Sequence, residues 1–416
     1  MSDADVLVVG AGPAGASAAR RLALAGVDVL LLDASSFPRS KPCGDCLSPG
    51  ATPLLRELGV LERLEGAGPG RLAGWRIRTP AGVWFGSRFG LADDGGSPRT
   101  GLALPRRELD DVLASAAVEA GARLRERTRV FDLLREDGRV AGVRARDAGG
   151  DPLELRARLV VGADGLRSTV ARRMGGVRRG PRDRLAVVGR FRGVEPARSG
   201  PPHGEMRLSR EGMLGLAPLG GGRWNATLVL PRERAPELAP DPGPLFRRRL
   251  EAYGVAGRFR DARPQGPLEV TGPFEVSPRR STVPGALLAG DAAGYFDPLT
   301  GQGVHRALAT GRAAAAAARA ILGADDPAAA EAARRRYGAR LRRLLDPGRR
   351  VQRLVDEVVT RPRLLEPMGR LLSARPGLAG LLLDVTGDRT APSALAAPRR
   401  LARAWRVGAA SPRRPG

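Results

Sequence analysis

A glycine run near the start of the chain has the residue types and the spacing that can hold a phosphate group. Gly10, Gly12 and Gly15 form a Gly-x-Gly-x-x-Gly pattern directly after the apolar segment 5–9. Gly10 permits a tight turn, Gly12 lets a pyrophosphate approach the backbone, and Gly15 lets a helix pack closely against a strand. The pattern indicates a dinucleotide site when a strand precedes it and a helix follows it.

The segments around the run predict both of these elements. The apolar segment before it and residues 27–33 are typical of buried parallel strands, and residues 14–25 predict a helix between them. Pro13 and Ala14 lie where that helix begins, so its first N–H groups are free to bind phosphate oxygens. Asp33 ends the second strand and can accept hydrogen bonds from ribose hydroxyls.

Two further motifs combine an acidic residue with glycine after an apolar strand. Asp164 and Gly165 follow residues 159–161, and read alone this pair indicates a turn. Gly290 and Asp291 end another strand, and a long helix is predicted over about 302–321. The start of that helix is rich in glycine: Gly301, Gln302, Gly303 and Val304. Such a strand end can bind an anion, although alone it is also an ordinary strand-to-helix loop.

The three motifs, in this order, resemble the FAD-binding domain of the superfamily that contains flavoprotein hydroxylases and geranylgeranyl reductases. The resemblance covers about residues 1–325. It implies that the middle motif approaches the dinucleotide and that Asp291 binds the ribityl chain. It also implies that the helix after Gly303 points its N-terminus at the flavin.

A loop after the second strand resembles the Pro-x-x-Lys-x-Cys-Gly-Gly loop of geranylgeranyl reductase-like proteins. The resemblance implies that Lys41, Cys43 and Gly44 approach the flavin. Asp45 replaces the second glycine of that pattern, and Cys46 is an addition. Lys41 is the one lysine among 69 basic residues, which indicates a site that does not tolerate arginine. A thioredoxin-like redox pair, or two inert buried cysteines, are the alternatives for the Cys-x-x-Cys.

Three single residues complete the expected site. Arg106, in a segment similar to the family's Arg-x-x-Leu-Asp helix start, is expected near FAD, and its alternative is a surface arginine. Val130 matches a strand position whose backbone meets the adenine. His305, in the first turn of the long helix, is a candidate catalytic residue beside Lys41 and Cys43, with an exposed histidine as the alternative.

The composition excludes several other classes of protein. The net charge is +25, but the arginines are scattered and only 4% of residues are aromatic, so we expect no nucleic-acid partner. Two histidines far apart and one cysteine pair predict no metal site. The N-terminus has no secretory signal and no apolar run is long enough to span a membrane, so we expect a cytoplasmic protein. Its basic surface leaves peripheral association with a membrane open.

The predicted fold is α/β, with a Rossmann-like FAD-binding domain, a β-sheet substrate domain and a C-terminal helical region. The FAD-binding domain is expected in residues 1–71, 100–182 and 276–325, and the substrate domain in 72–99 and 183–275. Helices broken at four prolines (Pro347, Pro362, Pro367 and Pro376) are expected in 326–388. A flexible, arginine-rich tail is expected in 389–416.

The function implied by the resemblance is that of an FAD-dependent oxidoreductase with NAD(P)H as the electron donor. Such a reductase passes a hydride from reduced flavin to a C=C bond of a hydrophobic isoprenoid or natural-product substrate. The alternative is an NAD(P)H-dependent monooxygenase that hydroxylates or epoxidises a natural product. Characterised geranylgeranyl reductases often carry Tyr and Trp where this chain has Met213 and Gly215, so the sequence leaves the substrate open.

Overall fold

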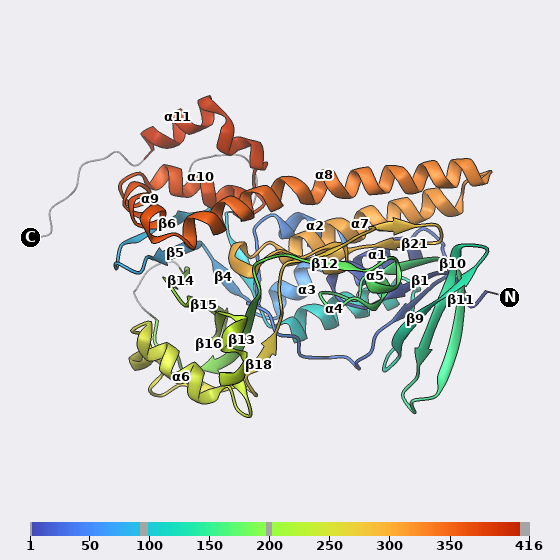
Figure 1. Cartoon of the computed structure of the whole chain (residues 1–416), viewed down its shortest axis with the longest axis horizontal. Coiled ribbons are helices and arrows are strands. Elements are labelled where there is room, and N and C mark those ends of the chain that lie inside the picture. Colours follow the sequence, from blue (N-terminus) through green and yellow to red (C-terminus); the bar gives the residue numbers. More distant parts are fainter. Residues whose placement is uncertain (1, 92–98, 197–201, 408–416) are drawn as a thin grey trace, which may run out of the picture.

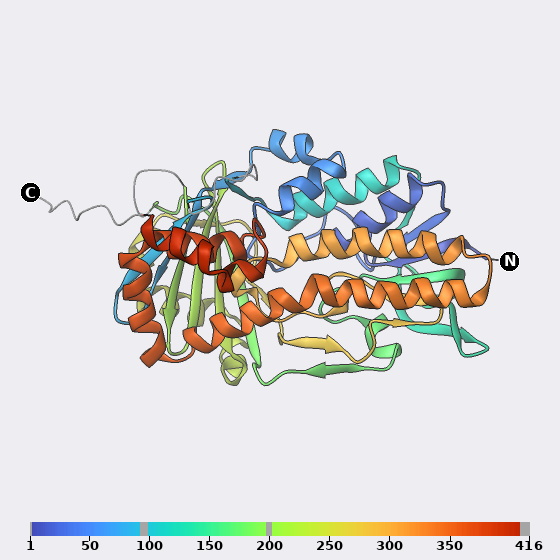
Figure 2. The same ribbon diagram turned by 90° about the horizontal axis from the view of Figure 1, so that it is seen from above.

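Two large sheets stand side by side in the computed structural model, and a layer of long helices runs along both of them (Figure 1). The structure describes residues 2–91, 99–196 and 202–407. Figure 2 shows the N-terminus at the end of the molecule formed by the first sheet, and the C-terminal helices at the opposite end. Among the described residues, no helix is long and apolar enough to cross a membrane.

The first sheet carries the glycine run. Its strands have the order β20-β21-β11-β1-β2-β8, and β10 and β9 continue from β11 as an antiparallel meander. The contacts of β1 with β2 and β11 are parallel, as are those of β2 with β8 and of β11 with β21. Its strands are β1 (Ala4–Val9), β2 (Val29–Leu32), β8 (Arg123–Arg125), β9 (Arg129–Glu136), β10 (Arg139–Arg146), β11 (Pro152–Gly162), β20 (Thr282–Val283) and β21 (Ala286–Leu288).

The turn from the first strand into the first helix explains why the run needs its glycines. The helix α1 (Pro13–Ala23) packs against α4 (Arg106–Glu119) and α7 (Gly303–Leu322). Gly10 has a φ of +98°, and a Cβ on Gly15 would lie 1.8 Å from the Gly10 carbonyl oxygen. A side chain at either position would therefore strain or block the turn from β1 into α1. The predicted βαβ unit is present.

The second sheet presents two different faces. Its strand order is β17-β13-β16-β15-β14-β5-β6, with β18 beside β13. One face packs against α6 (Gly243–Ala252) through residues such as Leu228 and Phe246, and the other carries Val188, Met206 and Met213 towards the first sheet. Its strands are β5 (Gly74–Arg78), β6 (Trp84–Arg88), β13 (Arg184–Arg192), β14 (Gly204–Ser209), β15 (Gly212–Gly220), β16 (Arg223–Pro231), β17 (Arg263–Pro264) and β18 (Glu269–Thr271).

Smaller elements connect the two sheets. A three-stranded sheet, β3-β7-β4, and the pair β12-β19 lie between them in the chain. These elements are β3 (Cys46–Leu47), β4 (Gly70–Leu72), β7 (Gly101–Ala103), β12 (Val177–Arg179), β19 (Val276–Pro278), α2 (Ala51–Glu57), α3 (Leu61–Gly66) and α5 (Thr169–Arg173). Together with the two large sheets and their helices, they confirm the predicted α/β fold class.

The C-terminal helices are more continuous than the prolines predict. Pro347 lies inside α8 (Pro327–Val359) and Pro367 inside α9 (Pro362–Ala374), so these two expected breaks are absent. Buried residues on both sides of Pro347, such as Leu345 and Val351, pack against neighbouring elements. This packing offsets the cost of proline in a helix, about 3 kcal/mol.

The expected flexible tail is also folded as far as residue 407. After α10 (Pro376–Thr386), the chain forms a 3₁₀ turn at Pro392–Ala396 and the helix α11 (Pro398–Arg406). Ala404 is fully buried, and Leu401 packs with it in a small apolar cluster. The segment contains few apolar residues and many arginines, so its composition predicts a solvent-exposed tail rather than a packed helix. Residues 408–416 of the predicted tail lie outside the described residues.

Candidate functional site

A cavity of about 190 Å³ lies where the carboxyl end of β1, the start of α7 and the second sheet meet. The residues of the predicted site that line it come from all three motifs, from the lysine–cysteine loop and from the start of α4. They are Gly12, Pro13, Ala14, Lys41, Cys43, Gly44, Arg106, Gly165, Gly290, Asp291, Gly301, Gln302, Gly303 and Val304. We call this space the cofactor cavity. The tertiary structure thus gathers segments almost 300 residues apart.

Two guanidinium groups face the start of α1. Gly12 is the N-cap of that helix, and a Cβ placed on it would lie 3.7 Å from Arg39 Nη2 and 3.8 Å from Arg106 Nη2. Arg106 makes a bidentate pair with the buried Asp110, at 2.7 and 2.8 Å, and Arg39 Nη1 lies 3.0 Å from the same carboxylate. One carboxylate therefore holds both cations beside the free N–H groups of a helix, and Arg39 Nη2 also lies 3.5 Å from Asp33 Oδ2.

This arrangement fits the pyrophosphate of a dinucleotide. Arg39 Nε is buried and has no hydrogen-bond partner among the described residues. A buried donor left unpaired is costly, and an anion would satisfy it. Arg39 cannot be picked out from the sequence, because no motif distinguishes it from the other arginines. Arg106 is not a surface arginine, since only 6% of it is exposed.

Other predicted residues hold the backbone around the cofactor cavity but do not line it. The Asp33 carboxylate accepts hydrogen bonds from the N–H groups of Ala11 and Ser35, both at 2.9 Å. The Asp33 carbonyl accepts a bond from Thr128 N–H, two residues before Val130 on β9. Asp33 and Val130 therefore lie at the same end of the sheet, where the sequence predicts the ribose and the adenine.

The middle motif is a capped turn. The Asp164 carboxylate accepts hydrogen bonds from Ser168 Oγ (2.5 Å) and from the N–H groups of Thr169 (2.6 Å) and Val170 (3.2 Å). Asp164 thereby fixes the turn before α5 and leaves Gly165 at the cavity wall. The Asp164 carboxylate is thus occupied by hydrogen bonds within the protein. The motif therefore forms the turn that it predicts when read alone.

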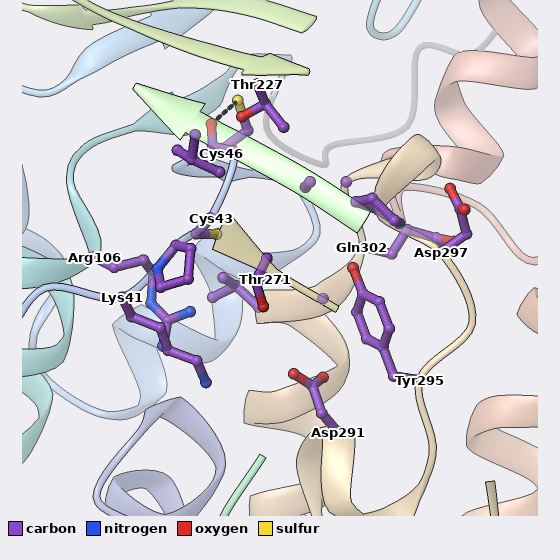
Figure 3. A pocket seen from close by; sticks show the side chains of 18 of the residues that line it. Lys41, Cys43, Cys46, Arg106, Thr227, Thr271, Asp291, Tyr295, Asp297 and Gln302 are labelled. Atoms are coloured by element: carbon purple, nitrogen blue, oxygen red, sulfur yellow. Dashed lines mark hydrogen bonds between the residues drawn. The ribbon is translucent and has the colours of Figure 1, made fainter. Parts of the chain in front are cut away.

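Figure 3 shows Lys41 and Arg106 on one side of the cofactor cavity and Asp291 and Tyr295 on the other. Desolvation by burial, followed by the neighbouring Arg106, lowers the pKa of Lys41. Lys41 Nζ lies 3.3 Å from the position that a Cβ of Gly165 would take. A lysine whose charge is destabilised in this way gains from a ligand that accepts its hydrogen bonds.

The two cysteines are wall residues rather than a redox pair. Burial raises the pKa of both thiols, that of Cys46 well above its ordinary value. Cys43 lies in a loop and Cys46 in β3, whereas a thioredoxin-like pair requires the first cysteine to open a helix. Cys46 Sγ donates to the Gly44 carbonyl at 3.1 Å. Both thiols are therefore protonated at neutral pH, and Cys43 carries its proton at the cavity wall.

Asp45, the departure from the family pattern, is a buried junction. Its φ is +56°, a conformation that favours the glycine found there in the pattern. Its carboxylate accepts hydrogen bonds from Arg190 Nε (2.6 Å), Asn225 Nδ2 (2.9 Å) and Arg106 N–H (3.2 Å). The lysine–cysteine loop is thereby fastened to β13 and β16 of the second sheet.

His305 does not line the cofactor cavity, so its expected contact with the flavin is not supported. Its Nδ1 lies 3.2 Å from Asp388 Oδ1, and its side chain borders another cavity, which Gln302 also lines. Gln302, the residue before the helix, does line the cofactor cavity, and its Nε2 donates to Asp388 Oδ1 at 2.6 Å. Gln302 and His305 are three residues apart, so their side chains lie on the same side of the helix start and meet the same carboxylate oxygen, but only Gln302 also reaches the cofactor cavity.

A second, apolar cavity of about 370 Å³ adjoins the first. The two share five lining residues: Cys46, Trp75, Met206, Leu299 and Gly301. The second is bounded by β5, β6 and β14 and by the C-terminal helices, through residues such as Ile77, Val358 and Leu372. We call it the tail cavity. The sequence gives no sign of this cavity, because its lining residues are scattered over more than 350 positions.

Comparison with known proteins gives the same cofactor. The model of the FAD binding domain matches residues 3–317. The chain is 36% identical over 329 residues to a menaquinone reductase of Mycolicibacterium smegmatis, covering 75% of each chain. It is 30% identical over 330 residues to a digeranylgeranylglycerophospholipid reductase of Methanosarcina acetivorans, covering 77% of this chain and 76% of the relative.

A solved structure has the same fold. A geranylgeranyl bacteriochlorophyll reductase-like protein of Thermoplasma acidophilum superposes with a TM-score of 0.71 at 21% identity, over 96% of this chain and 95% of that one. The three glycine motifs, the paired arginines and the matching domain agree on one cofactor. The chain therefore belongs to the family defined by this FAD binding domain, and it is an FAD-dependent oxidoreductase of the geranylgeranyl reductase-like kind.

Proposed function

We propose that this protein reduces C=C bonds in an isoprenoid lipid or in the isoprenoid chain of a quinone, with NAD(P)H as the electron donor. The observation that carries the proposal is the contact between the two cavities. An apolar space of about 370 Å³ opens beside the wall formed by Trp75, Met206 and Leu299. A long hydrocarbon chain suits such a space, because apolar surface gains about 25 cal/mol per Å² on leaving water.

The flavin, when bound, supplies the hydride for one carbon of the double bond. Arg39, Arg106 and the start of α1 would hold its pyrophosphate, and Asp33 its ribose. Asp291, Gln302 and Gly303 would lie along the rest of the cofactor, where the start of α7 stabilises negative charge.

Cys43 is the residue we propose to hold the proton for the other carbon. Its thiol lines the cofactor cavity, and burial raises its pKa, so Sγ is protonated under ordinary conditions. Tyr295 lies across the cavity, and its ring centroid is 5.5 Å from that of Phe274. Burial raises the pKa of Tyr295 well above its ordinary value. Its weaker acidity makes it a poorer donor than the thiol. Lys41 would bind the cofactor rather than take part in proton transfer.

The wall formed by the second sheet favours a wide substrate. Met213 and Gly215 line the cofactor cavity at positions where geranylgeranyl reductases often carry Tyr and Trp. A Cβ on Gly215 would meet nothing closer than 3.8 Å, so the space beside it is open. This opening agrees with the named relatives, one of which acts on a menaquinone, a ring joined to an isoprenoid chain.

The experiment that tests the proposal is an anaerobic titration of the purified protein, loaded with FAD and desalted. NADPH or NADH is added until the visible flavin band disappears. A menaquinone or a geranylgeranyl lipid in detergent is then added. We expect the flavin band to return without oxygen, and the product to gain two hydrogen atoms by mass spectrometry.

Two results would contradict the proposal. In the first, the flavin band returns only with oxygen, and faster with a substrate that gains an oxygen atom; this would establish the monooxygenase. In the second, NADPH and NADH both fail to bleach the bound flavin while dithionite succeeds, which would show that another donor is needed.

A further inference from the structure

Exposed apolar side chains gather at one end of the molecule. Among the described residues, eight large apolar side chains are exposed, and five of them lie on α8, α9 and α11. These five, which we call the apolar rim, are Leu354, Leu364, Met368, Leu371 and Trp405. Figures 1 and 2 show α9 and α11 at the end of the molecule that lies away from the N-terminus.

The helix α9 has two apolar faces with different surroundings. Leu364, Met368 and Leu371 are spaced i, i+4 and i+7, so they form one stripe, and all three are exposed. Leu365 and Leu372, one position further along, are buried against the body of the protein. A helix that is apolar on its outer face as well as its inner face has a second apolar environment to contact.

The apolar rim reaches the tail cavity at two of its residues. Leu354 is 62% exposed and Met368 is 40% exposed, yet both also line that cavity. The C-terminus of α9 connects the rim to α11, because Arg375 stacks on the ring of Trp405 at 4.3 Å. The apolar interior is therefore continuous with the apolar surface at this point.

Positive charge borders the rim. Residues 347–407 contain twelve arginines and five acidic residues. Asp356 and Asp384 are buried. Glu366 accepts hydrogen bonds from Thr79 and from the Ala81 N–H group. The exposed arginines of this segment are Arg350, Arg353, Arg361, Arg363, Arg370, Arg399, Arg400, Arg403 and Arg406. Arg361 pairs with Glu357 at 2.7 Å. The surface is thus apolar at its centre and cationic at its border.

We propose that the apolar rim inserts into the interface of a bilayer containing anionic phospholipid, and that the substrate chain passes from the bilayer into the tail cavity. Leucine, methionine and tryptophan suit the boundary between headgroups and acyl chains, and arginine suits anionic headgroups. Two copies of this surface would bring like charges together, which disfavours self-association. The entry of substrate rests on the proposed function, whereas the docking itself does not.

Vesicle flotation of the FAD-loaded protein tests the docking. Vesicles contain either phosphatidylcholine alone or phosphatidylcholine with phosphatidylglycerol. We expect flotation with the mixed vesicles, and a loss of about tenfold or more in the variant Leu364→Glu/Leu371→Glu. Neither residue lines the tail cavity. The matched control is Leu24→Glu/Val118→Glu, which changes two exposed apolar residues outside the rim and should float like the wild type.

The docking is overturned if the wild type does not float, if it floats equally with both vesicles, or if the control loses as much as the rim variant. A wild-type dimer in gel filtration that the rim variant abolishes would assign the surface to a second copy instead. Failure of the proposed function is distinguishable. In that case, the wild type floats with mixed vesicles and the rim variant does not, but no isoprenoid substrate is reduced.

The same variants test the route of entry. We expect the rim variant to turn over a short-chain substrate in solution at the wild-type rate, and to lose about tenfold or more in rate with a long-chain substrate embedded in vesicles. Equal rates on the embedded substrate would contradict entry through the rim.

Discussion

The cofactor cavity and the tail cavity share a wall, yet different kinds of residue line them. The lining of the first combines charged groups, among them Lys41, Arg106 and Asp291, with the backbone of three glycine motifs and an apolar wall that includes Val188 and Phe274. Apolar side chains from β5, β6, β14 and the C-terminal helices line nearly all of the second. The first must meet a fixed pattern of phosphates and ring atoms, whereas the second must only exclude water.

This difference explains why the cofactor cavity can be predicted from the sequence and the tail cavity cannot. A pyrophosphate is bound by consecutive backbone N–H groups, so the residues that permit the approach are close together in the chain. An apolar cavity can be lined by any large apolar residue from any element, so no spacing is required. The comparison also predicts that substitutions in the two regions have separable effects.

The largest effect is expected at the glycine run. Gly15→Val would place a side chain where even a Cβ lies 1.8 Å from the Gly10 carbonyl oxygen. We expect about 3 kcal/mol or more of lost unfolding free energy and no retained flavin. Thermal unfolding and the visible spectrum after desalting measure the two. Gly66→Ala is the control, because nothing lies within 4 Å of its added Cβ. Full flavin retention by Gly15→Val would contradict the assignment of this turn.

The next effect separates chemistry from binding. We expect Cys43→Ala to retain its flavin but to reduce substrate about 10²- to 10⁴-fold more slowly, the usual worth of a general acid. Because burial raises the thiol pKa, the wild-type rate should be constant across neutral pH and fall only as the thiol ionises, above its ordinary range. Stopped-flow reoxidation by substrate over a series of pH values measures both. A wild-type rate in Cys43→Ala would give the role to another group.

A smaller effect is expected where charge holds the cofactor. Arg106→Gln would remove one of the two guanidinium groups beside Gly12. We expect the Kd for FAD to rise about a hundredfold, because a cation that can pair with the pyrophosphate is lost. Fluorescence titration of the apoprotein with FAD measures the change. Arg107→Gln, an exposed neighbour on the same helix, should bind FAD as the wild type does. If both variants lost the same affinity for FAD, the effect would come from general surface charge and not from the place of Arg106 beside Gly12.

The smallest effect is expected in the tail cavity. Val358→Phe would narrow the tail cavity without touching the cofactor cavity. We expect kcat/KM for a long-chain substrate to fall about tenfold while the Kd for FAD is unchanged. Val270→Phe, at an exposed position outside both cavities, is the matched control. If Val358→Phe weakened FAD binding instead, the two cavities would not be separate binding regions.

Three residues show which parts of the site can be predicted from the sequence. Lys41 was selected because it is the one lysine in a chain rich in arginine, and it lies in the cofactor cavity. The place of His305 at the start of a helix predicts a contact with the flavin, but its side chain lies against Asp388 and outside the cofactor cavity. Asp45 looked like a simple replacement of glycine, and only the contacts with Arg190 and Asn225 reveal its role.

The sequence by itself determined the cofactor, the fold class and the lysine–cysteine loop that lines the cofactor cavity. These depend on local backbone requirements, which are written in adjacent residues such as Gly10 and Gly15. Only the tertiary structure decided that Arg39 joins Arg106 on one carboxylate, that a tail cavity adjoins the cofactor cavity, and that the C-terminal arginine-rich segment folds around its mouth. These depend on side chains brought together from distant positions, and packing selects them by volume and charge rather than by their order in the chain.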